Sequence, residues 1–195
     1  QAGAAFGTQP SVALIDAGGN VAHGDTSAVT LVLTTPGSAT LACGANPKDA
    51  VAGVATFTGC NVDVSNTYTL DASDGVLPGV SSDPFVISGA AAAALEFVTP
   101  PTGGAIGAAW TVQPVLRFVD AFGNTATSAG LVSIEVVIGP PTTNGVECTS
   151  NPQAAVNGVI TFAECTINTA SSPPRTWSLQ FVSDVGVLTA PVTEH

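Results

Sequence analysis

The chain has 195 residues, of which 45% are hydrophobic and 9% charged, and its formal net charge is −11. Three bases against 14 acids exclude a nucleic-acid-binding surface, because the phosphate backbone has to be met by clustered Lys and Arg. No apolar run reaches the roughly 18 residues that a membrane-spanning helix needs, so no membrane insertion is expected.

The first half of the chain contains short alternating runs separated by turn residues, a pattern typical of antiparallel strands. These runs lie at residues 10–16, 27–33, 39–43, 54–60, 67–73 and 83–88. The second half repeats the pattern at residues 111–120, 131–139, 144–150, 158–165, 175–183 and 190–194. Abundant Val, Ile and Thr suit pleated strands, and 21 Gly and 14 Pro supply turns, so the sequence predicts an all-β protein.

The two halves are copies of one another. GAAFGTQPSVALIDAGGNVA at residues 3–22 returns as GAAWTVQPVLRFVDAFGNTA at 107–126, and LACGANPKDAVAGVATFTGC at 41–60 returns as VECTSNPQAAVNGVITFAEC at 146–165. TYTL at residues 67–70 returns as TWSL at 176–179. Three landmarks in the same order indicate a tandem duplication with domain-sized units. We therefore expect two tandem immunoglobulin-like antiparallel β-sandwiches, at residues 1–90 and 91–195.

The ends of the two units differ. The strand-like lead at residues 95–103 has no counterpart in the first unit, so residues 1–90 are predicted to lack a first strand. The second unit is predicted to lack part of its last strand, because only a short run follows residue 188. Two explanations are compatible with this mismatch. The chain is a segment of a longer array, or neighbouring copies complete one another head to tail by strand addition.

Four cysteines form two pairs of equal spacing, Cys43 with Cys60 and Cys148 with Cys165. The equal spacing favours one disulfide within each unit, although sequence alone permits three connectivities. Disulfides persist in oxidising compartments, so an extracellular or cell-surface location is expected. CxxC is absent and the only histidines are His23 and His195, which does not favour zinc or redox chemistry.

One short motif marks each copy. DAGGN contains Asp16, Gly19 and Asn20, and DAFGN contains Asp120, Gly123 and Asn124. Each follows an alternating run, and Asp, Gly and Asn are typical turn residues, so both stretches are interpreted as turns. Phe122 stands where the first copy has a glycine, which argues against a phosphate-binding loop, and no further acid at fixed spacing supports an EF-hand.

No nucleophile elbow, Walker A or dinucleotide-binding motif occurs, so no catalytic residues or cofactor are predicted. Carboxylates offer weak candidates for a calcium site, and ordinary solvated or turn positions are the favoured interpretation of all of them. If the second disulfide joins neighbouring strands, two glutamates next to its cysteines are expected to lie on the face opposite the bridge. The candidates are Glu147, Glu164, Asp71, Asp74 and Asp83.

The pattern QPsVaLiDAgGNv, followed by a Thr/Val strand, LxCxxNPxxAVxGVATFxxC and YTLxAS, resembles bacterial immunoglobulin-like repeats of long cell-surface and secreted proteins. It is more distantly similar to the repeats of intimin and invasin. The resemblance implies a non-enzymatic building block of a surface fibre, filament or adhesin stalk. Its partners would be neighbouring copies or adjacent repeats, with a surface receptor or glycan as a further partner. Alternatives are a ligand-binding or spacer module of a secreted polysaccharide-acting enzyme, or a viral or phage surface decoration.

Overall fold

The structure, a computed structural model, describes residues 1–105, 107–127, 130–138, 142–169 and 175–194. Every regular element among them is a β-strand, so the predicted all-β class is confirmed. Because these residues form no helix, they also contain no helix of the length and apolarity that a membrane crossing requires. The chain divides into two compact parts, Gln1–Ser88 and Gly89–His195, called unit 1 and unit 2 below.

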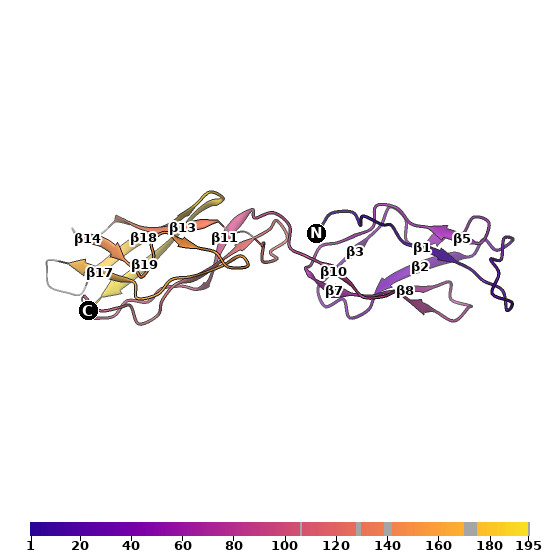
Figure 1. The fold of residues 1–195 in the computed structure, drawn as a ribbon, viewed down its shortest axis with the longest axis horizontal. Helices are drawn as coiled ribbons and strands as arrows, with labels where there is room; N and C mark the ends of the chain where they lie inside the picture. Colours follow the sequence, from indigo (N-terminus) through magenta and orange to yellow (C-terminus); the bar gives the residue numbers. More distant parts are fainter. Residues whose placement is uncertain (106, 128–129, 139–141, 170–174, 195) are drawn as a thin grey trace. The chain divides into compact units, whose positions relative to one another are not determined.

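Unit 1 is built from short strands (Figure 1). They are β1 (Ser11–Ala13), β2 (Ala28–Leu33), β3 (Leu41–Ala42), β4 (Lys48–Asp49), β5 (Val54–Thr56), β6 (Asn61–Val62), β7 (Asn66–Tyr68), β8 (Leu70–Ser73), β9 (Val80–Ser81) and β10 (Phe85–Ile87). Strands β4-β2-β8-β9 form one antiparallel sheet, and β1-β5, β3-β6 and β10-β7 pair separately. In β2 the apolar side chains Val29, Leu31 and Leu33 alternate with exposed ones, as a half-buried strand requires.

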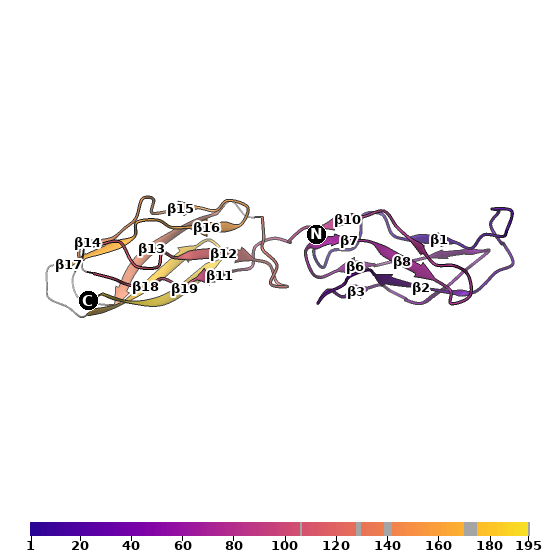
Figure 2. The ribbon, with the colours of Figure 1, turned by 90° about the horizontal axis from the view of Figure 1, so that it is seen from below.

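Unit 2 repeats this arrangement with longer strands and one additional strand at its start (Figure 2). They are β11 (Ala94–Thr99), β12 (Val115–Val119), β13 (Leu131–Ile138), β14 (Thr142–Glu147), β15 (Gln153–Ala154), β16 (Val159–Thr161), β17 (Thr166–Thr169), β18 (Arg175–Ser183) and β19 (Gly186–Glu194). The sheets are β15-β13-β18-β19, β11-β12-β16 and β14-β17, and all their pairs are antiparallel.

The end of unit 2 corrects one expectation. Instead of a truncated last strand, β19 runs over nine residues and pairs with β18 from Gly186 to Glu194. In unit 1 the corresponding edge is interrupted, because β9 pairs with β8 and β10 pairs with β7, and Ser82 to Pro84 separate them. The expectation was wrong because the short run after Leu188 continues the strand that begins at Gly186, so one unbroken strand replaces the two short ones of unit 1. Pro191 is tolerated in it because β19 is the edge strand of its sheet.

Unit 1 ends at Ser88 and unit 2 begins at Gly89. Gly89 and Ala90 belong to unit 2, where the Ala90 backbone N–H donates to the Asp120 carboxylate at 2.9 Å. Gly89 lies so close to the Thr125 carbonyl that a Cβ atom there would stand 2.3 Å from the oxygen. The hydrogen bond to Asp120 ties Ala90 to the second copy of the turn motif, and the close approach to Thr125 leaves no room for a side chain at residue 89.

The cores of the units differ in size. Buried hydrophobic residues of unit 2 form one cluster, whose largest members include Trp177, Phe118, Phe162 and Phe181. In unit 1 they form two smaller clusters, one containing Phe57 and the other Tyr68. Buried apolar area is the main favourable term in folding, so unit 1 is expected to be the less stable unit.

Candidate functional site

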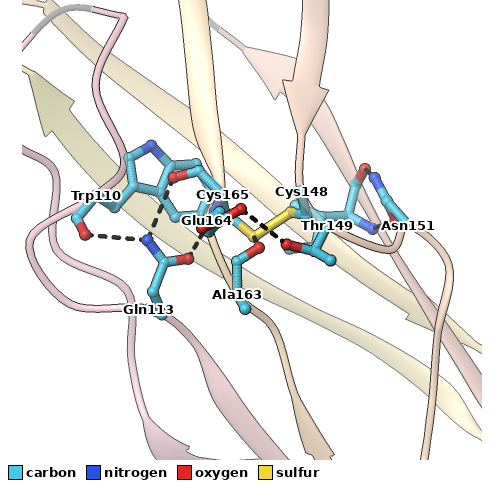
Figure 3. Close-up of a disulfide and its surroundings, with 9 residues drawn as sticks. Trp110, Gln113, Cys148, Thr149, Asn151, Ala163, Glu164 and Cys165 are labelled. Atoms are coloured by element: carbon cyan, nitrogen blue, oxygen red, sulfur yellow. Dashed lines mark hydrogen bonds between the residues drawn. A yellow bond between two sulfur atoms is a disulfide. The ribbon is translucent and has the colours of Figure 1, made fainter.

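In each unit a disulfide joins two paired strands near their ends. Cys43 follows β3 and is bonded to Cys60, which precedes β6. In unit 2 Cys148 follows β14 and is bonded to Cys165, which precedes β17 (Figure 3). Cys60 and Cys165 are fully buried in their cores, and the described residues contain no free cysteine. Each disulfide therefore fastens a strand pair to the core of its own unit.

A glutamine holds the backbone of the buried cysteine. The Gln113 side chain donates from Nε2 to the carbonyls of Trp110 and Cys165, and its Oε1 accepts from the Cys165 backbone N–H at 2.8 Å (Figure 3). Gln9 makes the same contacts in unit 1, with Phe6 and Cys60. The Gln-Pro dipeptide of the repeat is thus explained as a clamp between a loop and the disulfide, a role that sequence reasoning missed.

An asparagine serves as a substitute for a strand partner. Asn151 accepts from the Ile134 backbone N–H and donates to the Ile134 carbonyl, both at 2.9 Å. Asn46 makes the same reciprocal pair with Leu31. Each of these asparagines precedes a proline joined by a cis peptide bond. Backbone groups of β2 and β13 that no neighbouring strand reaches are satisfied in this way.

The DAGGN and DAFGN motifs form the same turn. One carboxylate oxygen of Asp16 accepts from the backbone N–H groups of Gly18 and Asn20, each at 2.9 Å. Asp120 accepts equivalently from Phe122 and Asn124. The backbone φ angle is +82° at both glycines that precede the asparagine, Gly19 and Gly123. Within the motif, the left-handed conformation is needed only at Gly19 and Gly123. The preceding position, Gly18 in the first copy, is Phe122 in the second, and the Phe122 side chain is exposed.

The two aspartates differ in burial. Asp120 is 3% exposed, whereas Asp16 is solvent-exposed. Burial alone would raise the pKa of Asp120, but hydrogen bonds from Ala90, Asn124 and Phe122 outweigh it and hold the pKa below its usual value. Backbone N–H groups of Asn20 and Gly18 lower the pKa of Asp16. Both carboxylates are therefore structural anions that complete a turn.

Replacing Asp120 with alanine is expected to destabilise unit 2 by about 2 kcal/mol, because several N–H groups lose a charged acceptor. Asp16→Ala is the matched control and should cost less, since water reaches that turn. Because the folded-state pKa is lowered, the contribution of Asp120 is complete above the ordinary value of 3.8 and is lost as the pH falls below it. Urea unfolding of both variants at pH 7 and pH 3 measures this. Equal losses for the two variants, or a loss independent of pH, would contradict the interpretation.

The carboxylates considered for calcium are distributed over separate hydrogen bonds. Glu147 accepts from the Asn168 side chain at 2.9 Å, and Glu164, in the turn before β17, accepts from Thr149 at 3.3 Å. Asp71 accepts from Ser81, and Asp74 accepts from the backbone of Val76 and Leu77, which lowers its pKa. Asp83 lies in the loop between β9 and β10. Within the described ranges, no three His, Cys, Asp or Glu side chains are grouped as metal ligands would be.

No family model matches the chain, and no curated protein matches it. Among solved structures, domains 4 and 5 of the S-layer protein SbsC are similar to it with a TM-score of 0.39 and 14% sequence identity, over 93% of this chain and 78% of that one. A structure of SbsC domains 4–9 is similar with a TM-score of 0.38 and 14% identity, over 94% of this chain and 24% of that one.

Proposed function

We propose that the chain is a non-enzymatic extracellular structural module made of two immunoglobulin-like sandwiches. It would serve as a building block of a cell-surface fibre, filament or adhesin stalk. The observation that carries this proposal is what the polar residues repeated in both copies bind. The glutamines, asparagines and aspartates that recur in both copies bind backbone groups of their own unit. Duplication has therefore preserved the groups that hold the fold.

The disulfides support an extracellular location. Disulfides persist in oxidising compartments, and each unit closes one of its own. The acidic, lysine-poor composition favours solubility over non-specific association. A sugar-binding module, in contrast, would favour several exposed aromatic side chains on one sheet face. Among the residues that the structure describes, Phe122 is the one aromatic side chain in the set of exposed large hydrophobic residues, and it lies in a turn.

Fractionation of the source material tests the location and the state of the cysteines together. The chain should be recovered outside the cells or on their surface, and a mass-tagged maleimide should label it only after reduction. Complete reduction should then add four labels, one for each cysteine. A chain found inside the cell with reactive thiols would contradict an extracellular structural role.

A further inference from the structure

The chain contains two Asn-Gly pairs, at residues 144–145 and 157–158, and both lie in unit 2. Asparagine is a thermally labile residue, and a following glycine favours its deamidation because no side chain shields the backbone nitrogen. The second pair, Asn157 and Gly158, lies in the connection from β15 to β16, two strands that are next to one another in unit 2 (Figure 2).

This connection is a tight turn. The Val156 N–H donates to the Val159 carbonyl at 2.8 Å, and the Val159 N–H donates back to the Val156 carbonyl at 3.1 Å. The backbone φ angle is +51° at Asn157 and +78° at Gly158. Reciprocal hydrogen bonds around two residues with positive φ are typical of a two-residue type I′ turn. Asn157 occupies its first central position and is exposed to water.

Gly158 is held from two sides. Its carbonyl accepts from the Phe118 backbone N–H of β12 at 2.8 Å. A Cβ atom at Gly158 would stand 1.9 Å from the Ala126 carbonyl oxygen, so the main chain of the turn packs directly on the segment that follows the second turn motif. From the next residue on, β16 pairs with β12. The backbone nitrogen that follows Asn157 therefore belongs to a residue whose position is fixed by unit 2.

Deamidation begins when that nitrogen attacks the side-chain carbonyl carbon. At this site a bond forms between the Gly158 nitrogen and Asn157 Cγ, and the Cγ–Nδ2 bond breaks. The amide nitrogen leaves as ammonia and takes the proton of the Gly158 N–H. Water then opens the resulting succinimide ring, at one carbonyl to aspartate and at the other to isoaspartate. Both products carry a carboxylate in place of the amide, and water is the only other reactant.

The folded turn opposes the first step. Ring closure requires Cβ of Asn157 and the Gly158 nitrogen to lie on the same side of the Asn157 Cα–C bond. In a type I′ turn the ideal ψ at the first central position is about +30°, which places these two atoms on nearly opposite sides of that bond. The hydrogen bonds of the turn and the one to Phe118 hold this conformation. Attack on Cγ therefore requires the turn to open.

We propose that Asn157 is a site of spontaneous deamidation whose rate is set by local opening of the β15–β16 turn. Native proteins open locally at free energies below that of global unfolding. Isoaspartate adds a methylene to the main chain, so the two-residue turn becomes one atom longer. Gly158 has no space to move toward Ala126, so the modified turn cannot close on β12 as before and unit 2 is weakened. Such ageing is independent of the proposed function of the module.

Unit 1 contains the same turn without the amide. Val51 and Val54 exchange backbone hydrogen bonds of 2.9 and 3.1 Å, and between them φ is +50° at Ala52 and +77° at Gly53. Alanine is thus accommodated at the position that corresponds to Asn157. The substitution Asn157→Ala is therefore a matched control, because it keeps the glycine and the turn but cannot form a succinimide.

Peptide mapping by mass spectrometry, during incubation of the full chain in mildly alkaline buffer, tests the proposal. The reference is the peptide QAAVNGVIT, residues 153–161, in which no folded unit holds the turn. Residue 157 should convert roughly tenfold to a thousandfold more slowly in the folded chain than in the peptide, and mainly to isoaspartate. Mapping separates this conversion from any at residue 144. A smaller ratio would show that the turn does not limit the reaction, and a larger one that it does not open locally, and either would overturn the proposal.

The substitution Val156→Pro removes the N–H that closes the turn and leaves Asn157 and Gly158 unchanged. It should raise the rate at residue 157 at least threefold, after correction by a peptide with the same substitution. Circular dichroism checks the fold, and the ratio between wild-type chain and peptide remains decisive if the variant unfolds. An unchanged rate in a folded Val156→Pro variant would contradict gating by the turn.

Urea unfolding of incubated samples measures the consequence for unit 2. Wild-type chain that has formed isoaspartate at residue 157 should unfold at a lower urea concentration than fresh chain. Asn157→Ala, incubated for the same time, should keep its unfolding midpoint. An equal fall in both proteins would overturn the inferred weakening of unit 2 by this residue.

Discussion

Reduction of both disulfides is expected to unfold unit 1 at a temperature at which unit 2 remains folded. Opening a loop of the length that separates Cys43 from Cys60 costs about 3 kcal/mol in the chain-entropy model. The same loss applies to Cys148 and Cys165, but unit 2 has the larger and continuous core. For a domain of this size, the loss corresponds to a fall in melting temperature of about 10–25 °C.

The chain contains its own reporters for the two units. Both tryptophans, Trp110 and Trp177, lie in unit 2, and the only tyrosine, Tyr68, lies in unit 1. Tyr68 and Trp177 are buried in their cores, so their near-ultraviolet signals follow the unfolding of each unit. The tyrosine signal should be lost first after reduction. The variants C43A/C60A and C148A/C165A separate the two contributions, and an earlier loss of the tryptophan signal in the reduced wild type would contradict the ranking of the cores.

The substitution Gly158→Ala is expected to destabilise unit 2 more than Gly123→Ala. Both glycines have a left-handed backbone, with φ of +78° and +82°, and this conformation costs any other residue about 1–2 kcal/mol. At Gly158 an added Cβ would also stand 1.9 Å from the Ala126 carbonyl oxygen, whereas at Gly123 it meets nothing within 4 Å. The main chain therefore has to shift in Gly158→Ala but not in Gly123→Ala.

Chemical unfolding of the two variants, followed by tryptophan fluorescence, measures the difference. Gly123→Ala should lose about 1–2 kcal/mol, and Gly158→Ala should lose that amount and a further contribution from the displaced backbone. Gly53→Ala provides a parallel test in unit 1, because its Cβ would lie 2.5 Å from the Ala22 carbonyl oxygen. Equal losses at Gly158 and Gly123 would show that the close approach between residues 126 and 158 does not constrain the fold.

The class of the fold was predictable because alternation and turn residues are local properties of the sequence. The runs at residues 27–33 and 175–183 contain β2 and β18, where every second side chain faces the core. Short strands such as β4 and β6 were not predicted, since two residues are too few to show alternation.

The roles of Gln113 and Asn151 could not be derived from the sequence, although both recur at equivalent positions. Their partners, Cys165 and Ile134, are distant along the chain, and only the folded backbone brings them together. Repetition indicated which residues matter, and the structure indicates what they bind.

An electron micrograph of the native material tests the central proposal, a building block of an extracellular assembly, most directly. We expect fibres or filaments in which modules follow one another with a constant repeat. Isolated particles, in material that carries both disulfides, would contradict a building block of a fibre or filament.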